Sequence, residues 1–315
     1  MNELRDKVCV ITGATSGVGW ALALALAKQG GRLFLIGRNQ TRAARLLKAI
    51  RKIDHDSQPV FLPCDLADQQ QIRATAAAIR AATPCVHLLI NNAHVRLGKV
   101  QANTDGTELT FAVNHLAYFT LTALLLEPLL AAPEARIINV SGDAYLWGSS
   151  DWERSINPAT VEQRRALATS KLANVIFTIE LARRLRGTAV TVNSMHPGIV
   201  ATRAGTNGQL WRMLKYYIYY GSKGEMISAG RAAIPLTELC ILPKWSRTTG
   251  CYFSNGQPQE VPAVARNAEA TSRLWDISLR LTGLDSELGQ AWQYFAPNPE
   301  CSYLKIPTRA TEPGI

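Results

Sequence analysis

The sequence lacks any long hydrophobic run. Its apolar stretches, such as residues 21–27, are far shorter than the roughly 18 residues that a membrane-spanning helix requires. The first residues also lack the apolar core of a signal peptide and lead directly into a strand pattern. We therefore expect a cytoplasmic protein without a membrane span.

Closely spaced cysteine pairs are also absent. The chain contains no C-x-x-C pair and no cysteine spacing typical of metal ligands. The cysteines are Cys9, Cys64, Cys85, Cys240, Cys251 and Cys301. This pattern predicts free thiols in a reducing compartment and no metal site.

Acidic residues are few, so the chain is basic. It has 24 acidic against 34 basic residues, a net charge of +10 at pH 7 and a pI near 9.5. The basic residues occur in small scattered clusters, such as Arg42, Arg45 and Lys48, and not in one run. We interpret them as solvated helix faces and expect no nucleic-acid partner. Peripheral contact with an acidic membrane surface is the main alternative.

Apolar strand patterns alternate with helical patterns along most of the chain. Strands are predicted over 8–12, 32–36, 59–63, 86–90, 136–141 and 190–194, and helices over 17–30, 41–52, 68–82, 106–131 and 161–185. Strands that are separated by helices pair in parallel through right-handed crossovers, and helices cover both faces of the sheet. The pattern predicts a single α/β domain with a Rossmann-type, doubly wound parallel sheet over residues 1–284.

Two segments depart from this alternation. Residues 201–234 are rich in aromatic side chains, and an insertion at this place lies over the carboxyl ends of the strands. We predict that this segment covers a hydrophobic small molecule, the alternative being that its aromatics belong to the core. Residues 285–315 contain several prolines and are predicted to form an irregular tail.

A glycine-rich turn follows the first predicted strand. Gly13, Gly17 and Gly19 stand in a G-x-x-x-G-x-G pattern that opens directly into a predicted helix. Glycines let a pyrophosphate approach the backbone, and the N-terminus of a helix favours its negative charge. The turn therefore predicts a dinucleotide site.

No acidic residue follows the second predicted strand. Sites that prefer NAD place an acid there to hold the ribose 2′-hydroxyl, whereas an arginine can accommodate the 2′-phosphate of NADP. Arg38 occupies this place. The sequence therefore favours NADP(H), the alternative being that Arg38 is a surface arginine without a ligand.

Further motifs along the chain resemble those of the short-chain dehydrogenase/reductase family, and within it the retinol-dehydrogenase-like branch. The resemblance covers about residues 5–284. Its markers are Thr12–Gly19, Cys64-Asp65-Leu66, Asn91-Asn92-Ala93, Asn114, Ile138–Ser141, Ser170–Asn174, His196-Pro197-Gly198, and Gly250–Phe253 followed by Leu274-Trp275.

The resemblance implies a complete cofactor site. Asp65 would contact the adenine, Lys171 the nicotinamide ribose, and Ile199 and Thr202 the carboxamide. The implied cofactor-binding set is Gly13, Ser16, Gly17, Val18, Gly19, Arg38, Asp65, Leu66, Asn91, Ala93, Lys171, Pro197, Gly198, Ile199 and Thr202. The family also implies a homodimer formed through the helices predicted over 106–131 and 161–185.

The catalytic residues are where this sequence departs from the family. The family reduces carbonyls with an Asn, a Ser, a Tyr and a Lys, of which Asn114 and Lys171 are present. The tyrosine position of the Tyr-x-x-Ser-Lys motif is Leu167, and the serine position is Gly142. Ser141 could replace the serine only if the alignment slipped by one residue. A positioned general acid contributes about 10²–10⁴ in rate, so we expect ordinary carbonyl reduction to be weak or absent.

Three nearby residues are candidates for a substitute acid. His94 stands where the family has glycine, and a histidine there adds a group that titrates near neutral pH. Asp143 and Tyr145 follow directly after Gly142. The alternative is that His94 only fills space and that Asp143 and Tyr145 face solvent or pack locally.

These features leave three functions open. The first is an atypical enzyme that binds NADP(H) and isomerises, cyclises or dehydrates a hydrophobic small molecule. The second is a catalytically inactive protein, a pseudoenzyme, that senses NADP(H) or acts as a scaffold for a partner. The third is a carbonyl reductase that uses a substitute acid on activated acceptors such as quinones.

Overall fold

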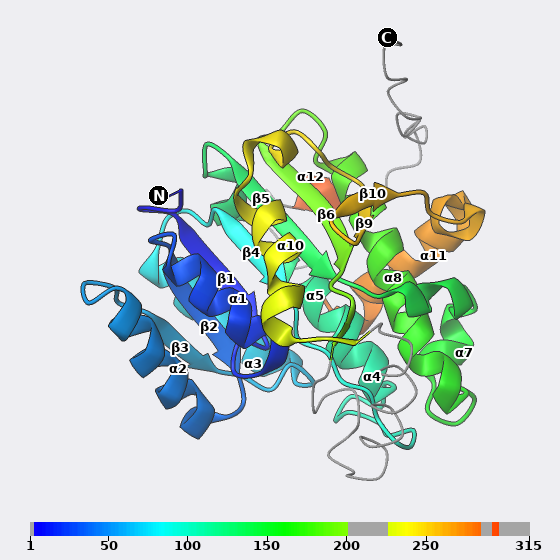
Figure 1. The fold of residues 1–315 in the computed structure, drawn as a ribbon. Coiled ribbons are helices and arrows are strands. Elements are labelled where there is room, and N and C mark those ends of the chain that lie inside the picture. The colour runs from blue at the N-terminus through cyan, green and yellow to red at the C-terminus, as the bar shows by residue number, and fades with distance from the viewer. Residues whose placement is uncertain (1–2, 201–225, 285–291, 296–315) are drawn as a thin grey trace.

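The computed structural model describes residues 3–200, 226–284 and 292–295. Its centre is an eight-stranded sheet in the order β10-β9-β6-β5-β4-β1-β2-β3 (Figure 1). All strands pair in parallel except β10, which is antiparallel to β9. The strands are β1 (Val8–Thr12), β2 (Arg32–Gly37), β3 (Val60–Pro63), β4 (Leu88–Asn91), β5 (Ala135–Val140), β6 (Val190–His196), β9 (Tyr252–Ser254) and β10 (Gln257–Gln259). The doubly wound parallel sheet predicted from the sequence is confirmed.

Helices cover both faces of the sheet, as its apolar strands require. Val8 and Val10 of β1 belong to one core cluster, and Cys9 and Ile11 belong to the other. One face carries α1 (Gly17–Ala27), α2 (Gln40–Ile53) and α10 (Ala229–Ile241), and the other carries α3 (Gln69–Ala82), α5 (Ala117–Leu124) and α8 (Gln163–Arg184). Because β1 is buried on both faces, it reads in the sequence as an uninterrupted apolar run.

The strand order places a switch point at the middle of the sheet. The chain moves outward from β1 to β3, returns to β4 on the other side of β1, and continues to β6. Loops that leave the carboxyl ends of β1 and β4 therefore diverge, and ligands of such folds bind in the space between them.

The sequence predicts one helix over 106–131, and the structure divides this region into several helical segments. It comprises α4 (Leu109–Phe111), a π-helical turn at Ala112–Leu116, α5, and α6 (Leu126–Leu130). The break before α6 has a clear cause, because Pro128 lacks the N–H that would bond to the carbonyl of Leu124. Arg80 donates to that carbonyl instead, at 3.4 Å. The predicted helix is therefore present from Leu109 to Leu130, but it contains a π-helical turn and a break at Leu125.

The structure describes only parts of the segments 201–234 and 285–315, and those parts differ from the predictions. Residues 201–225 lie outside the described residues. The two-residue strand β8 (Met226–Ile227) and the start of α10 follow, and α10 packs on α1 instead of covering the strand ends. The predicted irregular tail contains the helical turn α12 (Trp292–Phe295), whose Phe295 is fully buried with its ring 5.1 Å from that of Trp275.

The helices on which a homodimer was predicted are covered within the chain. Every residue of α5 is buried, and from Ala166 to Leu185 no position is exposed. The helix α11 (Ala268–Thr282) and α12 supply the cover, through ring contacts of Trp275 and Phe295 with Phe119. The homodimer through these helices stays a prediction.

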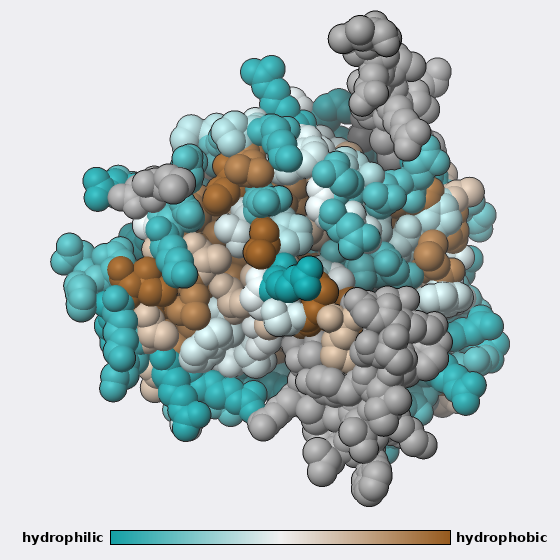
Figure 2. Space-filling model, viewed as in Figure 1, coloured by the Kyte–Doolittle hydropathy of each residue, from teal (hydrophilic) through white to brown (hydrophobic). Residues whose placement is uncertain are grey.

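The hydropathy of the outer surface fits helices whose apolar faces pack on the sheet. On the face seen in Figure 2, apolar side chains form separate small groups among hydrophilic ones. No helix within the described ranges is long and apolar enough to cross a membrane.

Candidate active site

The turn after β1 is held against the end of β4 by a close set of hydrogen bonds. Thr12 Oγ1 accepts from the backbone N–H groups of Asn92 and Ala93 at 2.9 and 3.0 Å, and Asn92 Nδ2 donates to the carbonyl of Thr12 at 2.8 Å. Gly13 has φ +66°, and a Cβ on Gly19 would overlap the Gly13 carbonyl oxygen. The two glycines are therefore needed for the turn itself.

The N-terminus of α1 is open to an anion. Ser16 is its N-cap but its side chain makes no capping bond, and the first turn holds no acid. In contrast, α2 and α3 are capped by the side chains of Asn39 and Asp68. Uncapped N–H groups at a helix N-terminus are what a pyrophosphate binds. Val18 can contribute only its backbone, because its side chain is buried in the core.

Arg38 and Asp65 meet at the ends of β2 and β3. The Nη1 of Arg38 lies 3.6 Å from Oδ2 of Asp65, and 66% of the Arg38 side chain is exposed. An exposed pair of this kind contributes little, so Arg38 can exchange Asp65 for a ligand phosphate. Leu66 is buried in the core and thus anchors the loop that carries Asp65.

Asn91 belongs to the predicted cofactor-binding set, and in the structure its side chain bonds to core residues. Its side chain is fully buried, and Nδ2 donates to Thr122 Oγ1 at 3.0 Å and to Asn139 Oδ1 at 2.9 Å. These bonds tie β4 to β5 and α5, while the buried Oδ1 of Asn91 has no hydrogen-bond partner among the described residues. Ala93 also takes part through its backbone, since its carbonyl accepts from Tyr118 Oη at 2.8 Å.

Asn114 lies in the π-helical turn and joins three segments. Its Oδ1 accepts from the N–H of Val95 at 2.7 Å, and its Nδ2 donates to the carbonyl of Val95 at 3.0 Å and to Ser170 Oγ at 3.1 Å. Its carbonyl accepts from Asn174 Nδ2 at 2.8 Å. Asn114 thus positions the loop after β4 against α8.

Lys171 projects from α8 toward the end of β5. Its Nζ donates to the carbonyl of Val140 at 3.1 Å, and the residue is only 5% exposed. Burial disfavours the charged amine and lowers the pKa of Lys171 to about 7. Ser141 Oγ donates to the carbonyl of Lys171 at 2.9 Å. Ser141 therefore faces the contact between β5 and α8, and the assignment of the serine position to Gly142 stays a prediction.

Neither of the two positions that differ from the family pattern is fully enclosed by the described residues. Leu167 precedes Lys171 by one helical turn and is partly exposed. Gly142 has an extended backbone, with φ 174°. Among the described residues, a Cβ on Gly142 would approach only Nδ1 of His196, at 3.7 Å. The fold thus has room for side chains that the sequence does not supply.

The three predicted substitute acids have different surroundings. Burial, and then the charge of Lys171, lower the pKa of His94 to about 4. His94 is therefore neutral at pH 7, which corrects the expectation that it titrates near neutral pH. Tyr145 is buried with its ring 4.7 Å from that of Tyr252, so it packs locally. Asp143 instead accepts from Tyr252 Oη at 2.6 Å.

His196 is a site residue that the sequence reasoning assigned no role. Its Nε2 lies 3.5 Å from Oδ2 of Asp143. The signal that could have found it is the His196-Pro197-Gly198 motif at the end of the sixth predicted strand. After Gly198, the strand β7 (Ile199–Val200) pairs with β8, which places Ile199 opposite Met226. Thr202 lies outside the described residues.

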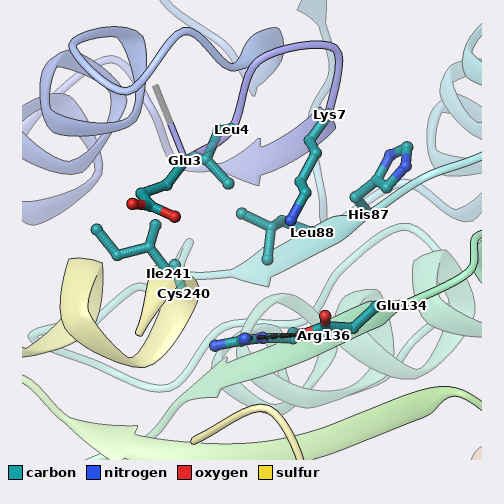
Figure 3. A pocket seen from close by; sticks show the side chains of 9 residues that line it. All are labelled: Glu3, Leu4, Lys7, His87, Leu88, Glu134, Arg136, Cys240 and Ile241. Atoms are coloured by element: carbon teal, nitrogen blue, oxygen red, sulfur yellow. Dashed lines mark hydrogen bonds and ion pairs between the residues drawn. The ribbon is translucent and has the colours of Figure 1, made fainter. Parts of the chain in front are cut away.

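A small cavity lies at the other end of the strands (Figure 3). Glu3, His87, Arg136 and Cys240 are among its lining residues, and its volume of about 20 Å³ has room for a single water. It is too small for a nucleotide. Within the described part of the chain, no three His, Cys, Asp or Glu residues are grouped to hold a metal ion.

Comparison with known proteins identifies the family. The family model described as short chain dehydrogenase matches residues 7–212. The chain belongs to the short-chain dehydrogenase family. It is 36% identical to retinol dehydrogenase 12 of Mus musculus over 289 residues, covering 90% of this chain and 89% of that protein. It is 37% identical to retinol dehydrogenase 11 of Homo sapiens over 287 residues, covering 90% and 87%.

Solved structures of short-chain dehydrogenases share the fold. The L-sorbose reductase from Gluconobacter frateurii, complexed with NADPH and L-sorbose, superimposes with a TM-score of 0.65 at 19% identity, covering 81% of this chain and 97% of that one. A protein from Mycobacterium paratuberculosis gives a TM-score of 0.68 at 26% identity, covering 89% and 94%.

Short-chain dehydrogenases bind nicotinamide cofactors, and the residues of this site fit one. The uncapped N-terminus of α1 matches a pyrophosphate. Lys171 is a buried amine beside the strand ends and matches a ribose hydroxyl pair.

The buried Lys171 should destabilise this short-chain dehydrogenase in a pH-dependent way. Its folded pKa of about 7 lies below the ordinary 10.5, so between these values the unfolded chain binds more protons and stability rises with pH. We expect Lys171→Met to raise the free energy of unfolding by about 2–4 kcal/mol at pH 6, after loss of one hydrogen bond. The gain should shrink at pH 9, as urea unfolding followed by circular dichroism can measure.

The exposed Lys48 of α2 supplies the matched control. Lys48→Met should change the free energy of unfolding by less than about 0.5 kcal/mol at either pH. An equal effect of Lys171→Met at pH 6 and pH 9 would mean that the amine of Lys171 titrates as it does in the unfolded chain.

Proposed function

We propose that this short-chain dehydrogenase binds NADP(H) and interconverts a hydrophobic alcohol and its carbonyl compound without the family's tyrosine and serine. The observation that carries the proposal is the buried amine of Lys171 beside two positions, 142 and 167, that the described residues do not fully enclose. Lys171 and Asn114 are held as a working site requires, while Leu167 and Gly142 leave room beside them. A buried amine has no structural use that an apolar side chain would not serve better.

Two features support a hydrophobic substrate. Leu146 and Trp147 lie on the turn that follows Gly142 and are 57% and 72% exposed. Large apolar side chains in such exposed places often mark a ligand or partner surface. The relatives named retinol dehydrogenase support the same substrate class, because retinol is a long apolar alcohol.

The preference for NADP(H) rests on Arg38. Its guanidinium is exposed at the end of β2, where a site for NAD(H) would carry an acid. Asp65 lies beside Arg38, but it follows β3 and its Oδ1 accepts from the N–H of Ala67 at 3.1 Å. The structural neighbour that is complexed with NADPH is in keeping with this preference.

Each part of the site has a role under this proposal. The nicotinamide, when bound, supplies or accepts the hydride. The turn from Gly13 to Gly19 holds the pyrophosphate, and Lys171 orients the nicotinamide ribose. Leu167 offers an apolar wall beside that ribose and excludes water from it. Asn114 keeps the loop after β4 fixed on α8.

A specific observation also favours a second function. Leu167 and Gly142 remove both hydroxyl groups that the family uses, so a catalytically inactive protein that senses NADP(H) is the competing candidate. It needs the nucleotide site but no proton donor.

Nucleotide titration and turnover separate these functions. We expect NADPH to bind with micromolar or tighter affinity, and about 10-fold or more tightly than NADH, by cofactor fluorescence. Arg38→Ala should remove the preference, and Arg45→Ala, an exposed arginine on α2, should keep it. The protein at high concentration is then incubated with NADPH and all-trans-retinaldehyde, and products are separated by chromatography.

The outcomes point to different conclusions. Formation of the alcohol together with oxidation of NADPH supports the proposal. A new product without any change in nicotinamide absorbance indicates the non-redox chemistry of an isomerase, cyclase or dehydratase. Bound nucleotide without product favours the inactive binder. Failure of both nucleotides to bind rejects all three functions.

A further inference from the structure

The imidazole of His196 lies beside the vacant serine position. His196 ends β6, and Gly142 follows β5, the neighbouring strand. The two strands are in register, because Ser141 N donates to the carbonyl of Met195 at 2.9 Å. The side chain of His196 is 15% exposed. A largely enclosed ring therefore lies at the carboxyl edge of the sheet, next to Gly142.

One ring nitrogen of His196 has no hydrogen-bond partner among the described residues. This atom is Nδ1, and it is buried. It faces the place where a side chain on Gly142 would begin, 3.7 Å from the ideal Cβ position. A buried polar atom without a partner is destabilising, so its retention calls for an explanation. A substrate oxygen in the open space would supply the partner.

The other ring nitrogen is held by a carboxylate. Oδ2 of Asp143 lies 3.5 Å from Nε2 of His196, and Oδ1 accepts from Tyr252 Oη at 2.6 Å. Tyr252 is itself buried against the ring of Tyr145. A carboxylate beside Nε2 favours the tautomer with its proton on Nε2, which leaves the lone pair of Nδ1 free.

Burial favours the neutral form of His196, and the nearby charges oppose one another. Burial lowers the pKa of His196 first, Asp143 acts in the opposite direction, and Lys171 lowers the pKa again. The imidazole can therefore accept a proton at neutral pH while Asp143 stabilises the charge that forms. His94 lacks these conditions, because its Nδ1 already lies 3.4 Å from the carbonyl of Asn92 and no carboxylate is among the groups that act on it.

We infer that His196 is the catalytic residue that exchanges a proton with the substrate oxygen, and that Asp143 is its positioning residue. The inference rests on the function proposed above. In oxidation, the alcohol O–H bond breaks and its proton forms a new bond to Nδ1. The oxygen keeps that electron pair and uses it to form the C=O bond as the C–H pair leaves as hydride. In reduction, Nδ1 returns the proton to the oxygen. The nucleotide accounts for the hydride in either direction.

The tautomer of His196 can be tested without substrate. The chain has five histidines, so ring nitrogens labelled with ¹⁵N can be assigned by substituting them one at a time. We expect neutral His196 to carry its proton on Nε2, and we expect Asp143→Asn to lower its pKa and weaken this preference. A proton on Nδ1, or an unchanged titration in Asp143→Asn, would overturn the inference.

Turnover tests the same residue by a second route. With NADPH and all-trans-retinaldehyde, His196→Gln should lower kcat about 100-fold, the low end for loss of a general acid. NADPH affinity should stay within about 2-fold, and the pH profile should lose the limb that His196 sets. His55→Gln, an exposed histidine, is the matched control and should leave kcat unchanged.

These experiments distinguish a failure of the role given to His196 from a failure of the proposed function. If the wild-type protein turns over and His196→Gln does so equally well, the role of His196 is wrong and the proposed function stands. If wild-type protein binds NADPH but reduces neither all-trans-retinaldehyde nor 9,10-phenanthrenequinone, the proposed function fails, and the role of His196 fails with it.

Discussion

The double variant Gly142→Ser, Leu167→Tyr should reduce all-trans-retinaldehyde with NADPH about 100-fold faster than the wild-type protein. The tyrosine restores a proton donor one helical turn before Lys171, and the serine restores a hydrogen bond to the carbonyl oxygen. A factor of 100 corresponds to about 2.7 kcal/mol in the activation free energy. The measured quantity is kcat/KM from the loss of NADPH absorbance, with the alcohol identified as product.

The fold can accept both side chains. Gly142 has an extended backbone that any residue adopts, and its nearest described neighbour leaves 3.7 Å for a Cβ. Leu167 is partly exposed on α8, so the longer tyrosine can extend outward from the core. Lys171 is nearby with a pKa of about 7, and its charged form would lower the pKa of a phenol beside it.

A matched variant isolates the phenol hydroxyl. Gly142→Ser with Leu167→Phe has the same bulk as the tyrosine variant but no donor, and it should show none of the gain. Adding His196→Gln to the tyrosine variant should cost less than it costs the wild-type protein, because the proton then has a second route. A folded tyrosine variant that binds NADPH and gains no activity would mean that the substrate does not lie between positions 142 and 167.

The central strands and the glycine turn were predictable because their signals are local. The strand predicted over 8–12 coincides with β1, since a strand buried on both faces is an apolar run whatever packs on it. The turn from Gly13 to Gly19 is equally local, because a tight backbone path demands glycine at fixed spacing. These two features were enough to predict the fold class.

The parts that depend on register and packing were not predictable. Asp143 and His196 meet only because β5 and β6 pair with Val140 opposite Met195. The side chain of Asn91 matches a binding motif, yet it belongs to the hydrogen bonds of the core. The cover of α5 and α8 comes from α11 and α12, at the far end of the chain, and helical periodicity does not show which chain covers an apolar face.

Lys171 connects the fold to the function. A protein that only needed to fold would gain stability from an apolar residue at this buried position, because burial works against the charged amine. Functional sites commonly retain such destabilising groups, and stabilising substitutions there reduce activity. Leu167, by contrast, adds apolar surface where the family has a hydroxyl. Under the proposed function, the site lacks the family's tyrosine and keeps the buried amine that would orient the nicotinamide ribose.

The substitution Gly19→Ala should weaken NADPH binding at least about 100-fold. A Cβ at this position would overlap the carbonyl oxygen of Gly13 and lie 2.6 Å from Nδ2 of Asn92. Neither group can yield easily, because Asn92 is held by its hydrogen bond to the carbonyl of Thr12 at 2.8 Å. The turn must therefore open, which displaces the N–H groups at the start of α1 and costs about 1–3 kcal/mol of stability. Fluorescence titration measures the affinity, and a thermal melt monitors folding.

Gly230→Ala is the matched control for this change. Gly230 also lies in a helix, α10, but among the residues that the structure describes its added Cβ would approach only Ser228 Oγ, at 3.9 Å. This variant should bind NADPH as the wild-type protein does and gain roughly 0.5–1 kcal/mol, because alanine favours the helix. If Gly19→Ala melts as a folded protein and still binds NADPH with wild-type affinity, the pyrophosphate does not lie on the first turn of α1. The nucleotide would then bind elsewhere, and the roles given to Arg38 and Lys171 would lose their common basis.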